Sequence, residues 1–306
     1  MSLLTKSDAL IDLTPGRTAG NVWVQSDLQL GKPELARQVL AEAVTDMTNL
    51  GEPIDAIWCL GDALVGKNLE ALEQVAEACV ELLEPLGVPI CYVLGNHEMD
   101  LFRETGVPRF PLYEQAVERP LWHTMDRLDQ PWFERRCFGS RVVFFGDHAD
   151  PDGEWCTSHH QKRIGPERYP YGPEVWRQLR DEIADVHEPV ITAGHYAYPG
   201  GQRPSPLLAD CLPVPDTVRL HMYGHAHIGD LVHNGERPYQ RDNPIKGQSL
   251  RQYNISALET ARTAGSHSVL LRFQNGLPTR LDVRCHLEHK WLESFELNAH
   301  PTPAGS

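Results

Sequence analysis

The 306-residue sequence contains no run of eighteen apolar residues, so no segment matches the apolar length that a membrane-spanning helix requires. Its first residues include Asp8 and Asp12 and lack the apolar core of a secretory signal peptide. From these absences we expect a cytoplasmic protein without membrane association.

A complete disulfide framework is also absent, because the seven cysteines are an odd number and no two of them form a CxxC pair. Cys59, Cys79 and Cys91 lie within apolar periodic segments, where free thiols behave as small buried hydrophobic groups. We therefore expect reduced, structural cysteines in a reducing compartment.

Basic residues are few: 28 Lys and Arg stand against 42 Asp and Glu, for a net charge of −14. No basic run occurs, which argues against general nucleic-acid binding. A phosphorylated substrate is still compatible with this charge if divalent cations invert the local field. The sequence has neither a G-x-S-x-G nor an HExxH motif, so it lacks these signatures of serine hydrolases and zinc peptidases.

Strand and helix patterns alternate in the first half of the chain. Strands are predicted at 21–26, 55–60 and 89–94, with one amphipathic helix from Pro33 to Gly51 and another at 69–83. Strands joined by single helices of this length predict parallel βαβ units. In such sheets the chemistry gathers beyond the carboxyl ends of the strands.

The second half is less regular. We expect an insertion or cap at about 101–140 and a helix at 174–186, and the alternation at 268–273 and 281–285 predicts antiparallel strands. A disordered tail is expected from about residue 300. No long linker divides the chain, so residues 1–306 are predicted to form a single domain.

Five short polar blocks each follow an apolar, strand-like run. They are Asp27-Leu28-Gln29, Gly61-Asp62, Gly95-Asn96-His97-Glu98, Gly194-His195 and Gly224-His225-Ala226-His227. Hydrolysis of a phosphoester at neutral pH needs a nucleophilic hydroxide and cations that neutralise the phosphoryl oxygens, and a pair of metal ions supplies both. Carboxylate, amide and imidazole ligands together suit Mn²⁺, Fe, Zn²⁺ or Co²⁺ better than Ca²⁺.

In this order, the blocks resemble the D-x-H, GD, GNH(E/D), GH and GHxH motifs of the calcineurin-like metallophosphoesterase family, from residue 27 to residue 227. The resemblance implies an α/β fold in which two sheets form a sandwich flanked by helices. It also implies that Asp27, Asp62 and His227 bind a first metal ion. The second ion would be bound by Asp62, Asn96, His195 and His225, and His97 would contact phosphate and protonate the leaving group.

Gln29 departs from the pattern, because it stands where the family usually has histidine. Its amide oxygen is a poorer ligand than imidazole for a borderline ion. Gln29 could bind the first metal weakly with harder ions such as Mn²⁺ favoured, water could replace it, or the first site could be empty. We favour a functional but weakened first site, because every other ligand is present.

The function predicted is therefore a phosphoesterase that uses two divalent ions, with Mn, Fe or Zn preferred. Its expected substrate is a phosphomonoester or phosphodiester of a small molecule, a nucleotide or phosphometabolite, attacked in line by a metal-bound hydroxide. The alternative is a catalytically weak metal-binding scaffold that binds partners, for which only Gln29 speaks. The sequence does not indicate an oligomeric state.

Two further features admit two interpretations. The tryptophans Trp122, Trp132 and Trp155 either line a substrate pocket or pack against the core. The polar segment at 159–163, with two histidines, a lysine and an arginine, either faces the substrate or forms a solvated loop.

Overall fold

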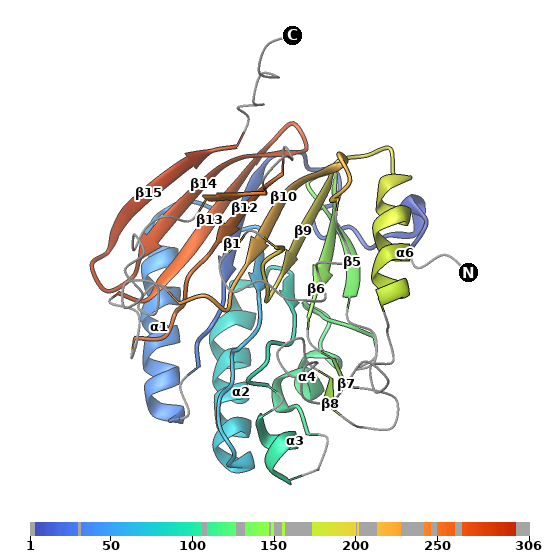
Figure 1. Ribbon diagram of the computed structural model, residues 1–306. Coiled ribbons are helices and arrows are strands. Elements are labelled where there is room, and N and C mark those ends of the chain that lie inside the picture. The colour runs from blue at the N-terminus through green and yellow to red at the C-terminus, as the bar shows by residue number, and fades with distance from the viewer. Residues whose placement is uncertain are drawn as a thin grey trace.

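The computed structural model describes residues 4–29, 32–98, 100–105, 109–126, 132–146, 148–149, 155–156, 173–199, 201, 213–227, 242–245, 250–260 and 265–297. Two sheets pack face to face between helices, and a two-stranded ladder of β7 (His148–Ala149) and β8 (Trp155–Cys156) lies apart from them (Figure 1). No helix in these segments is long and apolar enough to cross a membrane.

The first sheet is mixed, with the strand order β15-β14-β13-β1-β2-β3-β4. Its parallel half contains β1 (Gly20–Gln25), β2 (Ala56–Cys59), β3 (Ile90–Tyr92) and β4 (Trp122–His123). Helices α1 (Pro33–Asn49) and α2 (Leu69–Leu83) make the first two crossovers, in agreement with the predicted βαβ units. The antiparallel half is formed by β13 (His267–Gln274), β14 (Leu277–Cys285) and β15 (Lys290–Glu296), as the C-terminal alternation predicts.

The second sheet has the order β11-β12-β10-β9-β6-β5. Its four inner strands are parallel: β6 (Ser140–Phe145), β9 (Val190–Gly194), β10 (Val218–Tyr223) and β12 (Arg251–Asn254). The edge strands β5 (Trp132–Cys137) and β11 (Asp242–Pro244) run antiparallel to their neighbours. Helix α6 (Pro173–Ala184) agrees with the predicted helix at 174–186.

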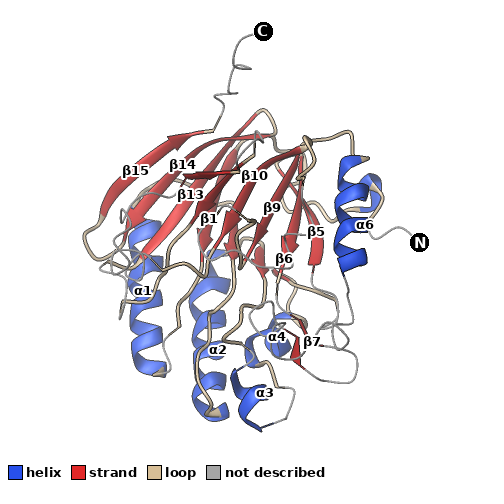
Figure 2. Ribbon diagram, viewed as in Figure 1, coloured by secondary structure: helices blue, strands red, loops and turns tan. Residues whose placement is uncertain are grey.

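Alternation along the second sheet divides the core between its two faces. Val142 and Phe144 of β6 belong to the large apolar core that includes the first sheet, α1 and α2, whereas Val143 and Phe145 pack with Leu179 of α6. Successive strand residues point to opposite faces, so one face of the second sheet meets the first sheet and the other meets α6. The layers in Figure 2 confirm the predicted α/β sandwich of two sheets flanked by helices.

The segment at 101–140, where we expect an insertion or cap, contributes to both sheets. It supplies β4 to the first sheet and β5 to the second, along with the short helices α3 (Asp100–Thr105) and α4 (Pro111–Ala116). Strand β4 has two residues, and β5 carries Glu134, Arg135 and Arg136, so neither shows the apolar alternation that marks a strand. The expected disordered tail lies outside the described residues, and a single domain stays a prediction.

A buried ionic cluster ties α1 to the first sheet. Asp46 of α1 accepts two hydrogen bonds from the Arg284 guanidinium, at 2.7 and 2.8 Å, and is only 4% exposed. The Nδ1 atoms of His286 and His289 also lie 2.9 and 2.8 Å from its carboxylate oxygens. Nε2 of His286 lies 2.8 Å from the hydroxyl oxygen of Ser268, which accepts a hydrogen bond from the indole N–H of Trp23.

Candidate metal centre

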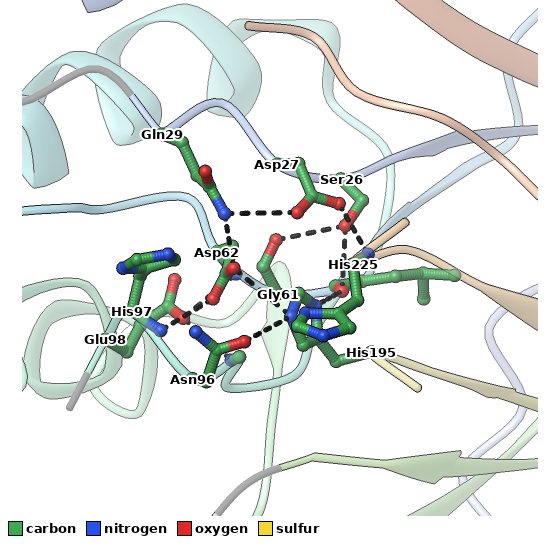
Figure 3. A network of polar contacts seen from close by, with 12 residues as sticks. Ser26, Asp27, Gln29, Gly61, Asp62, Asn96, His97, Glu98, His195 and His225 are labelled. Atoms are coloured by element: carbon green, nitrogen blue, oxygen red, sulfur yellow. Dashed lines mark hydrogen bonds and ion pairs between the residues drawn. The ribbon is translucent and has the colours of Figure 1, made fainter. Parts of the chain in front are cut away.

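The predicted ligands converge where the carboxyl ends of parallel strands from both sheets meet. Asp27, Asp62 and Asn96 follow β1, β2 and β3 of the first sheet. From the second sheet, His195 follows β9, and the pair His225 and His227 follows β10. Figure 3 shows the side chains of Asp27, Gln29, Asp62, Asn96, His195 and His225 around one centre.

Four of these residues have left-handed backbone conformations: φ is 56° at Asp27, 36° at Gln29, 54° at Asp62 and 64° at His225. Non-glycine residues adopt such angles at a cost of about 1–3 kcal/mol each, and they concentrate at functional sites. The tight turns that follow the strands thus aim the polar side chains into one place at the expense of stability.

The glycines of the polar blocks are required mainly for close approach. A Cβ on Gly95 would collide with the Asp62 carboxylate, and one on Gly224 would collide with the hydroxyl of Ser26. A Cβ on Gly61, where φ is 87°, would lie 2.8 Å from His195 Nδ1. Of these three glycines, only Gly61 also has a positive φ, a backbone conformation that favours glycine.

The donor atoms form two groups that share Asp62. In the first group, His227 Nε2 lies 3.0 Å and Gln29 Nε2 lies 3.2 Å from Asp27 Oδ1. In the second, His195 Nε2 lies 3.2 Å from Asn96 Oδ1, and Asp62, His195 and His225 offer ligand atoms within 4.8 Å of one another. Asp62 Oδ2 faces both groups, 2.5 Å from Gln29 Nε2 and 3.2 Å from His195 Nε2.

The electrostatics of the centre favour positive charge. Burial alone would raise the pKa of Asp62, but attraction to His195 holds it well below its ordinary range. Burial would likewise raise the pKa of Asp27, but attraction to His227 outweighs burial and lowers it. Burial would lower the pKa of His195, whereas Asp62 raises it to about 10. Two buried carboxylates surrounded by imidazoles are thus a fitting environment for cations.

Gln29 takes part in the centre, because its side-chain amide contacts the carboxylates of Asp27 and Asp62. The amide nitrogen and oxygen differ by a half-turn, so the same position can present an oxygen to a cation. The donor set fits divalent ions, with a neutral amide in the first group where an imidazole is usual in the family.

His97 lies at the rim of the centre, with its side chain 30% exposed. Its backbone N–H donates to Asp62 Oδ1 at 2.7 Å, and its Nδ1 lies 2.7 Å from Asp100 Oδ2. Burial alone would lower the pKa of His97, but the hydrogen bond with Asp100 and the charge of Asp62 raise it. His97 is therefore suited to carry a proton beside the predicted ligands.

Sequence reasoning missed the structural role of Glu98. This carboxylate is 3% exposed and accepts hydrogen bonds from four backbone N–H groups, those of Asp62, Ala63, Leu64 and Gly95, at 2.6–3.3 Å. It thereby holds together the turns that carry Asp62 and Asn96. Its burial and the nearby charge of Asp62 raise the pKa of Glu98 to about 7. Its place in the Gly95–Glu98 block was the only sequence signal.

The structure describes the side chains of two of the three tryptophans for which the sequence allows two interpretations. Trp122 and Trp132 are 5% and 3% exposed and pack in the two apolar cores, and Trp122 also lines a small cavity whose wall includes Asp27 and Gly61. The side chain of Trp155 and the segment at 159–163 lie outside the described residues.

This cluster of carboxylates, imidazoles and an amide at the edge of two sheets is a donor set that fits divalent metal ions. The family model for the calcineurin-like phosphoesterases matches residues 20–229, and the chain belongs to that family. It is therefore a phosphoester hydrolase that depends on divalent metal ions.

Solved structures share the fold at low sequence identity. A dimetal phosphatase from Danio rerio is 12% identical with a TM-score of 0.60, over 92% of this chain and 99% of that one. Purple acid phosphatase PPD1 from yellow lupin seeds is 14% identical with a TM-score of 0.55, over 92% of this chain and 54% of that one. No curated protein matches this chain in sequence.

Proposed function

We propose that the chain hydrolyses the phosphoester of a small molecule, a nucleotide or phosphometabolite, by in-line attack of water at phosphorus. The observation that carries the proposal is the position of Asp62, whose Oδ2 faces the Gln29 amide on one side and His195 on the other. A carboxylate so placed suits a bridge between two cations. Divalent ions bound there would activate the water and neutralise the phosphoryl charge.

Each side chain receives a separate role in this proposal. Asp27, Gln29 and His227 hold the first ion, Asn96, His195 and His225 hold the second, and Asp62 reaches both. Mn, Fe and Zn are the ions preferred, because the ligands combine carboxylate, amide and imidazole. The neutral Gln29 weakens the first site relative to the second. A cytoplasmic location stays a prediction.

Removing the metal should abolish hydrolysis, and restoring it should recover the activity. We expect protein stripped with a chelator to be inactive on p-nitrophenyl phosphate and bis-p-nitrophenyl phosphate, and Mn²⁺ to restore turnover of at least one. The faster substrate distinguishes monoester from diester chemistry. Activity that survives complete metal removal, verified by elemental analysis, would contradict the proposal.

A titration of the stripped protein with Mn²⁺ tests the role of Gln29 separately. Two sites of unequal affinity are expected. Two equally tight sites would contradict a weakened first site, and a single bound ion would indicate a mononuclear centre.

His97 is proposed as the acid that protonates the leaving group. We expect His97→Asn to lower kcat by about 10²–10⁴-fold on an alkyl phosphate, because general acid catalysis typically contributes that factor. The loss should be much smaller on p-nitrophenyl phosphate, whose leaving group needs no proton. Steady-state kinetics on both substrates check this. An equal loss on both would assign His97 to phosphate binding instead.

A further inference from the structure

Glu259 is a buried carboxylate next to the first group of ligands, and no polar block of the sequence includes it. It lies five residues beyond the end of β12 and is 1% exposed. One carboxylate oxygen, Oε1, lies 3.0 Å from Nδ1 of His227. The opposite ring nitrogen of His227, Nε2, is the atom that faces Asp27 Oδ1 at 3.0 Å.

The backbone of Glu259 contacts the same group from another direction. Its N–H donates to the carbonyl oxygen of Asp27 at 3.0 Å, and the N–H of Leu258 donates to that of Ser26 at 3.0 Å. Glu259 therefore contacts Asp27 through its main chain and His227 through its side chain. These are two of the residues proposed to hold the first ion.

The loop that carries Glu259 is itself firmly attached. The Asn254 side chain donates to the carbonyl of Ala226 at 2.6 Å, and its oxygen accepts the N–H of Ser256 at 2.8 Å. Ser256 has a φ of 67°, a left-handed conformation like those of Asp27, Asp62 and His225. The loop that carries Glu259 is thus hydrogen-bonded to the turn that bears His227.

His195 in the second group offers a direct contrast. Its Nδ1 donates to a neutral acceptor, the carbonyl oxygen of Leu60, at 2.9 Å. His227 has a carboxylate in the corresponding position. A carboxylate on Nδ1 fixes the imidazole with Nε2 directed at the metal and increases its basicity as a ligand. The group in which Gln29 supplies only a neutral amide is therefore the one whose histidine, His227, has an anionic partner.

We propose that Glu259 is a positioning residue for the first metal site, which orients His227 and makes its Nε2 a stronger ligand, and so offsets the weak ligand Gln29. The proposal rests on the proposed function, because it takes Asp27, Gln29 and His227 as ligands of one ion. It assigns to a loop remote in sequence the control of affinity at one of the two sites.

The test is the metal affinity of Glu259→Gln, measured calorimetrically with Mn²⁺ on chelator-stripped protein. This substitution keeps the size of the side chain and an acceptor oxygen while it removes the charge. We expect the dissociation constant of the weaker site to rise by about 10–100-fold, the usual effect of losing such a partner. The stronger site should be unchanged.

A double-mutant cycle separates positioning from a merely structural role. If Glu259 acts through His227, Glu259→Gln should change metal binding no further in a His227→Ala background. Additive losses in the double variant would overturn the proposal. Glu134→Gln is the matched control, because Glu134 is a buried glutamate of the edge strand β5, paired with Arg141. It should leave both metal affinities at the wild-type values.

The remaining outcomes distinguish this inference from the proposed function. If Glu259→Gln binds both ions with the affinities of the wild type, the inference alone is overturned. The same follows if the wild-type protein binds one ion whose affinity Glu259→Gln leaves unchanged. A wild-type protein that binds no divalent ion would overturn the proposed function as well.

Discussion

Asp62→Asn is expected to lower kcat by at least about 10³-fold, or about 4 kcal/mol in the activation barrier. The reason is the position of Asp62 Oδ2 between the two donor groups, with Gln29 Nε2 at 2.5 Å and His195 Nε2 at 3.2 Å. An amide of the same shape has no charge to share between two cations. The loss should therefore include several kcal/mol of charge stabilisation in the transition state.

The same substitution should also weaken the metal-free fold. Burial would raise the pKa of Asp62, but attraction to His195 outweighs it and lowers that pKa, so the charge of Asp62 stabilises the folded protein at neutral pH. The charge also raises the pKa of nearby Glu98, which offsets part of this stabilisation. We expect the melting temperature of metal-free Asp62→Asn to be lower than that of the wild type.

Kinetics with saturating Mn²⁺ and thermal melts of the stripped proteins provide both measurements. Asp126→Asn is a suitable control, because Asp126 is exposed and should leave activity and melting temperature unchanged. Turnover of Asp62→Asn within tenfold of the wild type would contradict the bridging role. A melting temperature of the Mn²⁺-treated variant below the assay temperature would show instead that the lost activity reflects unfolding.

The largest loss of stability is expected from Asp46→Asn, a substitution at a residue outside the metal centre. Asp46 accepts both hydrogen bonds of the Arg284 side chain within the core and contacts His286 as well. Removing one partner of a buried ion pair leaves the other charge without compensation, which costs about 3–5 kcal/mol. Urea denaturation should show this decrease in the free energy of unfolding.

An exposed ion pair of the same helix provides the control. Arg37 of α1 pairs with Glu81 of α2, and their side chains are 49% and 57% exposed. Glu81→Gln should cost less than about 1 kcal/mol, because solvent screens such pairs. Equal effects of the two substitutions would show that the Asp46 cluster contributes no more than a surface pair.

The Asp46 contribution should also depend on pH. Arg284 and the two histidines outweigh burial and hold the pKa of Asp46 well below its ordinary value. Its stabilisation is therefore fully present above the pKa of an unfolded aspartate, about 3.9, and is lost as the pH falls toward the folded value. The difference in unfolding free energy between wild type and Asp46→Asn should shrink below about pH 4. A difference that is constant from pH 7 to pH 3 would exclude this linkage.

Much of the centre was predictable because its residues follow strands in a regular order. An apolar run followed by glycine and a polar residue is a local signal, and parallel strands bring their carboxyl ends to one edge. The residues that support the centre carry no such signal. Glu98 was visible only as part of a block, and Glu259 lies 32 residues from His227 in an unremarkable loop.

By itself, the sequence determined the α/β character, the boundaries of α1 and α2 within a few residues, and the set of candidate ligands. Only the tertiary structure decided that β4 and β5 are edge strands, that Asp46 meets Arg284 and that Glu259 meets His227. The physical reason is the range of the interactions. Helix and strand periodicities repeat within a few residues, whereas the Asp46–Arg284 contact joins residues 238 apart, and no local pattern encodes such a pairing.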